Sequence, residues 1–127
     1  MKIQESGEDY LEAVLVLKQT KGIVHSIDVA HHLGFSKPSV SRAMKLLRED
    51  GDVTMDTDGA IELTDKGMEI ASSIYERHVL ITHWLTQLGV SQEQAAADAC
   101  RMEHVLSAET FEKLKAHILV EEDPEQV

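Results

Sequence analysis

The sequence lacks most of what would build a sheet-rich or disulfide-stabilised protein. Only 4% of its 127 residues are aromatic, so the core must come mainly from Leu, Val, Ile, Ala and Met. Few segments alternate apolar and polar residues as strands do, and a mainly α-helical fold is therefore expected. The single cysteine, Cys100, excludes an internal disulfide and fits a reducing compartment.

Long apolar segments are also missing. No apolar run approaches the roughly 20 residues that a membrane helix needs, and the first residues lack the hydrophobic region of a signal peptide. We therefore expect a cytoplasmic protein with no membrane partner.

Positive charge is scarce, but it is concentrated. The chain has 12 Lys and Arg against 23 Asp and Glu, for a net charge of −11, which argues against nucleic-acid binding by the whole surface. Between Ser36 and Arg48, however, stand four cations and no acid: Lys37, Arg42, Lys45 and Arg48. A basic segment in an acidic protein indicates where a polyanion would dock.

The first half of the chain has the order of a winged helix-turn-helix. Helices are expected up to about Thr20, over residues 26–33, and after Ser36, which serves as an N-cap. Gly34 punctuates the tight turn between the second and third helices. Two short alternating segments, residues 53–55 and 61–63, then flank Asp58-Gly59, a strong signal for a two-residue hairpin turn.

The second half predicts helices only. A long helix is expected over residues 66–88, followed by one capped by Ser91 and a last one over residues 108–120. The long helix has more apolar surface than one small domain needs, which suggests packing against a second copy. The expected fold is thus mainly α: a winged helix-turn-helix domain with a small β-hairpin wing over residues 1–64, then an all-helical dimerisation domain over residues 65–127.

The basic third helix is the candidate DNA-reading element. The first residues of a recognition helix reach base edges in the major groove, and later cations reach phosphates. Arg42 is the best candidate for bidentate contact with guanine. The alternative is that these cations only solubilise the helix. The candidate DNA-binding residues are Ser36, Lys37, Pro38, Ser39, Ser41, Arg42 and Lys45.

A second group of residues has the chemistry of a metal site. On a helix, Cys100, Glu103 and His104 share one face, and thiolate, carboxylate and imidazole are ligands of divalent transition metals. The alternative is a buried cysteine beside a surface Glu-His pair. Asp9 and Glu12 also share a face of the first helix, where two solvated acids near a helix N-terminus are an equally good explanation.

These motifs together carry a resemblance to a known family. The string Asp98-Ala99-Cys100-Arg101-Met102-Glu103-His104 has a spacing highly specific to the diphtheria toxin repressor family of metal-dependent transcriptional regulators. Further matching segments are residues 8–12, 36–41, 63–67, 77–78 and 105–107. The resemblance covers nearly the whole chain. It extends to the manganese-sensing branch of the family.

The resemblance implies a function and a ligand set. It implies that Fe²⁺ or Mn²⁺ binding activates a homodimer to bind a double-stranded DNA operator and repress metal-uptake genes. The implied metal ligands are Asp9, Glu12, His78, Cys100, Glu103 and His104. By its own sequence context, a lone histidine such as His78 is more often structural than ligating.

The implied ligands mix two branches of the family. Asp9 and Glu12 match the manganese type, whereas Cys100 matches the iron type, where the manganese type has Glu. Thr82 and Ala96 stand where the iron type has further ligands of a second site. The C-terminal SH3-like domain of the iron type is expected to be absent, and Zn²⁺, Co²⁺ or Ni²⁺ are expected to bind in vitro.

Two other functions are compatible with the same elements. One is a winged-helix regulator that senses an organic ligand in its apolar helical half, which a metal titration would distinguish from a metal sensor. A metal-binding enzyme would need a general acid and base, but the candidate residues are already used as ligands. We therefore expect no enzymatic activity.

Overall fold

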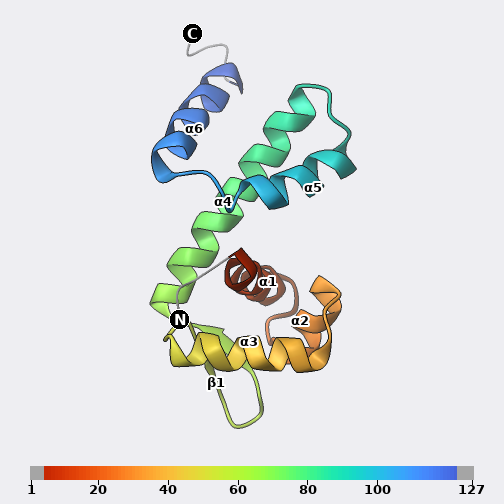
Figure 1. Cartoon of the computed structure of the whole chain (residues 1–127), viewed down its shortest axis with the longest axis vertical. Helices are drawn as coiled ribbons and strands as arrows, with labels where there is room; N and C mark the ends of the chain where they lie inside the picture. Colours follow the sequence, from red (N-terminus) through yellow and green to blue (C-terminus); the bar gives the residue numbers. More distant parts are fainter. Residues whose placement is uncertain (1–4, 123–127) are drawn as a thin grey trace. The chain divides into compact units, whose positions relative to one another are not determined.

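The computed structural model describes residues 5–122. Its order is α1 (Glu5–Lys21), α2 (Ser26–Leu33), α3 (Lys37–Glu49), β1 (Val53–Met55), β2 (Ile61–Leu63), α4 (Asp65–Gln87), α5 (Gln92–Met102) and α6 (Ala108–Glu122) (Figure 1). The predicted mainly α-helical fold with one small hairpin is confirmed.

The chain divides into two compact units, residues 1–73 and 74–127, so that α4 contributes to both. The domain limits predicted from the sequence, 1–64 and 65–127, stay a prediction. Within the described residues, no helix is both long and apolar enough to cross a membrane.

The first unit is built around the three helices of the helix-turn-helix. α1 contacts both α2 and α3, and Leu11 and Val14 of α1 are fully buried with Val40 and Leu47 of α3. Gly34 ends α2 with a φ of 73°, a left-handed conformation that favours glycine. These contacts place α3 against a shared apolar core and leave its other face open.

The wing differs from the sequence-based prediction in its turn. β1 and β2 are antiparallel, with Val53 opposite Leu63 and Met55 opposite Ile61. The connection spans residues 56–60 rather than the predicted two-residue turn. The reason is Asp56, whose Oδ1 accepts the backbone N–H groups of Asp58 and Ala60 at 2.8 and 2.9 Å and so closes a wider loop.

Hydrogen bonds connect the residue before α4 with the residues that precede the wing. The Thr64 hydroxyl donates to the carbonyl of Gly51 at 2.6 Å, and the Thr64 N–H donates to the carbonyl of Asp52 at 3.1 Å. The Asp52 side chain is fully buried, with Lys66 Nζ 3.3 Å from its Oδ1. Gly67 approaches so closely that an added Cβ would lie 1.9 Å from the Asp52 carbonyl oxygen.

The second unit combines the end of α4 with α5 and α6. Ser91 caps α5 by accepting the Gln94 N–H at 3.2 Å, and Ser107 caps α6 by accepting the Thr110 N–H at 3.0 Å. Ile81, Ala99 and Ile118 are among the buried residues of this unit. Both caps agree with the helix starts expected from the sequence.

The close approach at Gly67 yields a prediction about stability. Gly67→Ala in a helix would normally be favourable, but here the new Cβ meets a backbone oxygen that no rotamer change can move. We expect a loss of about 1–3 kcal/mol in the free energy of unfolding, measured by urea denaturation in chelator. Ser72→Ala, an exposed position on the same helix, should change little. An alanine variant as stable as the parent would contradict the close approach.

Candidate metal centre and nucleic-acid interface

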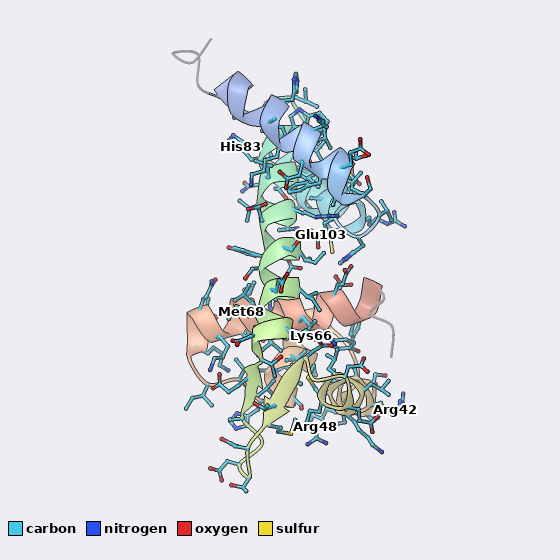
Figure 2. All side chains as sticks on the ribbon, turned by 90° about the vertical axis from the view of Figure 1, so that its left-hand side faces the viewer. Arg42, Arg48, Lys66, Met68, His83 and Glu103 are labelled. Carbon is cyan, nitrogen blue, oxygen red and sulfur yellow. The ribbon has the colours of Figure 1, made fainter. Side chains whose placement is uncertain are left out.

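Four of the six predicted ligands come together in the second unit. His78 lies on α4, Cys100 is near the end of α5, and Glu103 and His104 follow directly. The thiol sulfur of Cys100, a Glu103 carboxylate oxygen and a His104 ring nitrogen all lie within 4.8 Å of one another. His78 Nδ1 lies 2.9 Å from Glu103 Oε2. Figure 2 labels Glu103 beside α4.

The backbone around these ligands differs from the prediction of a continuous helical face. α5 ends at Met102, Glu103 is its C-cap with φ −61° and ψ −23°, and His104 lies in the following turn. The Val105 N–H donates to the Met102 carbonyl at 3.2 Å, which tightens the chain after the helix. Cys100 and the Glu-His pair still meet, but through a helix end and a turn.

Glu103 is the central residue of the cluster. Its side chain is fully buried, and the His104 side chain is only 1% exposed. Glu103 Oε1 has no hydrogen-bond partner among the described residues, although His104 Nε2 lies 3.5 Å away. A buried carboxylate oxygen without a donor is costly unless a cation satisfies it.

The donor set fits a divalent metal ion. It offers one thiol, one buried carboxylate and two imidazoles, side chains that bind divalent transition metals in proteins. Cys100 is exposed, so an ion can reach the thiol from solvent. The Glu103 oxygen that has no hydrogen-bond partner among the described residues lies next to the other candidate ligands, as expected for a residue that binds a cation.

Arg77 is a residue whose importance the sequence analysis missed. Its Nη1 donates to the carbonyl oxygens of Glu103 at 3.0 Å and Leu106 at 2.7 Å. Its guanidinium carbon lies 5.1 Å from the centre of the Phe111 ring, a cation–π contact. The signal for it in the sequence was its place in the family-matching segment 77–78, directly before His78.

The other two predicted ligands belong to the first unit. Asp9 and Glu12 lie one turn apart on α1, and both are half-buried. Their position relative to the cluster of the second unit stays a prediction.

The predicted DNA-binding residues lie on the outer side of α3. Lys37, Pro38, Ser41, Arg42 and Lys45 are exposed, and Figure 2 shows Arg42 and Arg48 projecting from this helix. The open face of α3 is therefore basic and free of acids up to Glu49.

Ser36 and Ser39 have a structural role in addition. The Ser36 oxygen accepts the Ser39 N–H at 3.3 Å, and the two hydroxyls are hydrogen-bonded at 2.8 Å. Arg42 Nη2 donates to the Ser39 oxygen at 3.5 Å. These contacts begin the helix and orient Arg42 near its first turn.

The wing has the opposite charge to α3. Asp56, Asp58 and Glu62 are exposed on the hairpin, and Glu62 pairs with Lys18 of α1. An acidic hairpin is repelled by phosphates. Polyanion binding by this unit is therefore expected on α3.

Tyr10 connects α1 with the start of α3. Its ring packs edge-on against Phe35 with centroids 5.7 Å apart, and Phe35 directly precedes the Ser36 cap. Burial raises the pKa of the Tyr10 hydroxyl above its usual value, a shift that the charge of Arg42 opposes and that of Asp9 adds to. The helix that carries Asp9 is thus packed against the element that carries Arg42.

Fold and site together define a class. A winged helix with a basic third helix is typical of DNA-binding modules, and the unit that follows it carries a cluster of side chains that could hold a metal ion.

Comparison with known proteins identifies the family. Residues 2–61 match the family model described as "Iron dependent repressor, N-terminal DNA binding domain". Residues 64–125 match "Iron dependent repressor, metal binding and dimerisation domain". The chain belongs to this family, the diphtheria toxin repressor family of metal-dependent transcriptional regulators, and is not an enzyme.

Individual relatives agree with this family assignment. The transcriptional regulator MntR of Escherichia coli O6:H1 is 35% identical over 112 residues, covering 88% of this chain and 72% of the relative. A helix-turn-helix regulator of Methanocaldococcus jannaschii is 34% identical, covering 89% and 92%. The solved structure of the manganese regulator SloR superposes with a TM-score of 0.79 at 28% identity over 93% of this chain. This chain spans 54% of the SloR chain.

The unsatisfied oxygen of Glu103 leads to a prediction with two measurements. Glu103→Gln removes a buried negative charge while keeping the shape of the side chain. We expect the metal-free protein to remain at least as stable as the parent in thermal unfolding, because no charge is left uncompensated. We also expect Mn²⁺ affinity, measured by calorimetry, to fall by more than the roughly 10- to 100-fold typical of outer-shell changes. Unchanged affinity would exclude Glu103 as a ligand.

Proposed function

We propose that this protein is a cytoplasmic repressor that senses Fe²⁺ or Mn²⁺ and controls metal-uptake genes by binding a double-stranded DNA operator as a homodimer. The observation that supports it most directly is the buried Glu103 carboxylate, whose Oε1 has no hydrogen-bond partner within residues 5–122 and lies beside two imidazoles and a thiol. The basic, exposed face of α3 in the same chain supports the DNA-binding part of the proposal.

The proposed ligands come from both units. Cys100, Glu103, His104 and His78 form the part of the site whose geometry is described above. Asp9 and Glu12 of α1 are proposed to complete it, because they share one helix face and match acidic ligands of the family's manganese type.

The proposed activation depends on the carboxylates of the chain. A bound divalent cation supplies the positive charge that lets several carboxylates converge on one point. Without it, Asp9 and Glu12 are repelled by the Glu103 carboxylate, and α1 is held less firmly. Because α1 shares its core with α3, restraint of α1 also restrains the recognition helix. Less ordering then remains when DNA binds, and affinity rises.

Residues of α3 are proposed to read the operator. Lys37 and Arg42, in the first turns of the helix, contact base edges, and Lys45 contacts phosphates. Ser41 and Pro38 are placed on the same exposed face for further contacts, and Ser36 and Ser39 position the first turn. A homodimer presents two such helices to a two-fold symmetric operator.

The chain's own ligands give opposing signals about the metal. The Cys100 thiolate favours Fe²⁺ over Mn²⁺, and Zn²⁺ more strongly still. Asp9, Glu12 and Glu103 suit Mn²⁺ and Fe²⁺ equally, and the relative SloR is a manganese regulator. Operator binding titrated with Fe²⁺ and Mn²⁺ under anaerobic conditions, with Zn²⁺ for comparison, distinguishes the two.

The first test concerns α1. Asp9→Ala should abolish the metal-stimulated increase in DNA affinity, because α1 is no longer tied to the cluster. The measurement is DNA binding by fluorescence anisotropy with and without Mn²⁺. Glu8→Ala, a half-buried acid next to Asp9 in the chain, is the matched control and should retain stimulation. Full stimulation in the Asp9 variant would refute the role of α1.

The second test separates metal binding from DNA reading. Arg42→Ala should leave Mn²⁺ affinity unchanged but weaken DNA binding by about 1–3 kcal/mol if Arg42 contacts a guanine. The matched control is Arg101→Ala, an exposed cation of α5, which should leave DNA binding intact. Equal effects of the two substitutions would mean that only net charge matters.

The third test concerns metal selectivity. Cys100→Glu replaces a soft ligand by a hard one, as in the family's manganese type. We expect the ratio of Zn²⁺ affinity to Mn²⁺ affinity to fall by about tenfold or more, measured by competition with a chelator of known affinity. An unchanged ratio would show that Cys100 does not bind the ion.

A further inference from the structure

The segment that carries Glu103 and His104 needs support from outside its own helix. α5 ends at Met102 and α6 begins at Ala108, so the ligands lie at a helix end and in a turn. Carbonyl groups at a helix C-terminus have no partners within the helix, and such a turn is free to shift unless another group binds them. A site that needs its donors held in place must therefore find this support elsewhere.

Arg77 provides that support. Its Nη1 donates to the carbonyl oxygens of both Glu103 and Leu106, at 3.0 and 2.7 Å, and so spans the turn. The same guanidinium lies 5.1 Å from the centre of the buried Phe111 ring in α6. A cation near the carbonyl end of a helix is also favoured by the helix dipole.

Glu103 is consequently held at both its backbone and its side chain by successive residues of α4. Arg77 binds its carbonyl oxygen, and His78 Nδ1 lies 2.9 Å from its carboxylate Oε2. The position of Glu103 therefore depends on two adjacent residues of a different helix.

We propose that Arg77 is a positioning residue for the metal centre: it fixes the turn from Glu103 to Leu106 so that Glu103 and His104 are set for the ion before the ion binds. This inference rests on the proposed function, since it requires that Glu103 and His104 are ligands.

Whether metal affinity rises or falls when Arg77 is replaced distinguishes a positioning role from a purely electrostatic effect of its charge. A guanidinium near a cation site repels the cation, so removal of its charge alone would raise metal affinity. Removal of the turn's support lowers affinity, because the ligands must be ordered when the ion binds. The two explanations predict opposite results for the same variant.

The test is Mn²⁺ binding measured by calorimetry on the chelator-treated full chain. Arg77→Leu should weaken binding by about tenfold or more, as loss of outer-shell support does. Arg77→Lys keeps the charge but loses the planar donor group, and should show a smaller loss in the same direction. Ile118 is buried in α6, well after the turn in the chain. Ile118→Val is expected to lower stability and to leave Mn²⁺ affinity unchanged.

Each outcome is decisive. Mn²⁺ affinity equal to or above that of the parent in a folded Arg77→Leu variant overturns the proposal, as does a loss no larger than that of Ile118→Val. If Arg77→Leu does not fold, Arg77→Lys decides in the same way, and parent-like affinity overturns the proposal. Failure of the parent itself to bind Mn²⁺, Fe²⁺ or Zn²⁺ would instead refute the proposed function.

Discussion

The Glu103 carboxylate is fully buried, and one of its two oxygens has no hydrogen-bond donor within the described chain. A charge in this position costs free energy unless a cation offsets it. The neighbouring groups are those that bind a divalent ion: His78 on one oxygen, His104 near the other, and the Cys100 thiol. The second unit thus has an unfavourable electrostatic feature that metal binding would remove.

The two halves of the chain divide the work of a sensor. The second unit supplies a group of donors on α4, α5 and the turn after α5. The first unit supplies the basic helix α3, which packs with α1 in one apolar core. Acidic side chains favour cation binding in the second unit, but they would oppose the binding of DNA phosphates in the first unit. This explains why the cations are concentrated on α3 in a chain with a net charge of −11.

Local signals in the sequence predicted most of the fold. The Ser36 cap, the glycine after α2 and the alternating segments of the wing all act over a few residues, and each appears in the structure. The predicted turn of the wing was wrong because Asp56 accepts two backbone N–H groups and closes a wider loop. The helical face expected to carry Cys100, Glu103 and His104 is also interrupted, because α5 ends at Met102. The turn after α5 is stabilised by Arg77, which lies 26 positions before Glu103 and 29 positions before Leu106 in the chain. No local pattern reveals contacts over such separations.

The candidate site was predictable in its residue types but not in its energetics. The spacing of Cys100, Glu103 and His104 and the family resemblance predicted candidate ligands, and the structure brings these three side chains together. The full burial of Glu103, its oxygen without a partner among the described residues and its contact with His78 depend on tertiary contacts that no local pattern reveals. Likewise, the supporting role of Arg77 appears only once its two carbonyl partners are known.

The central claim is that one ion couples α1 to the cluster around Glu103. Hydrogen–deuterium exchange of the full chain, with and without Mn²⁺, tests it most directly. We expect amides of α1 around Asp9 and Glu12 and amides around Glu103 to become protected together at the same Mn²⁺ concentration, and we expect Glu103→Gln to abolish both changes. Protection around Glu103 alone, with exchange in α1 unchanged, would contradict it.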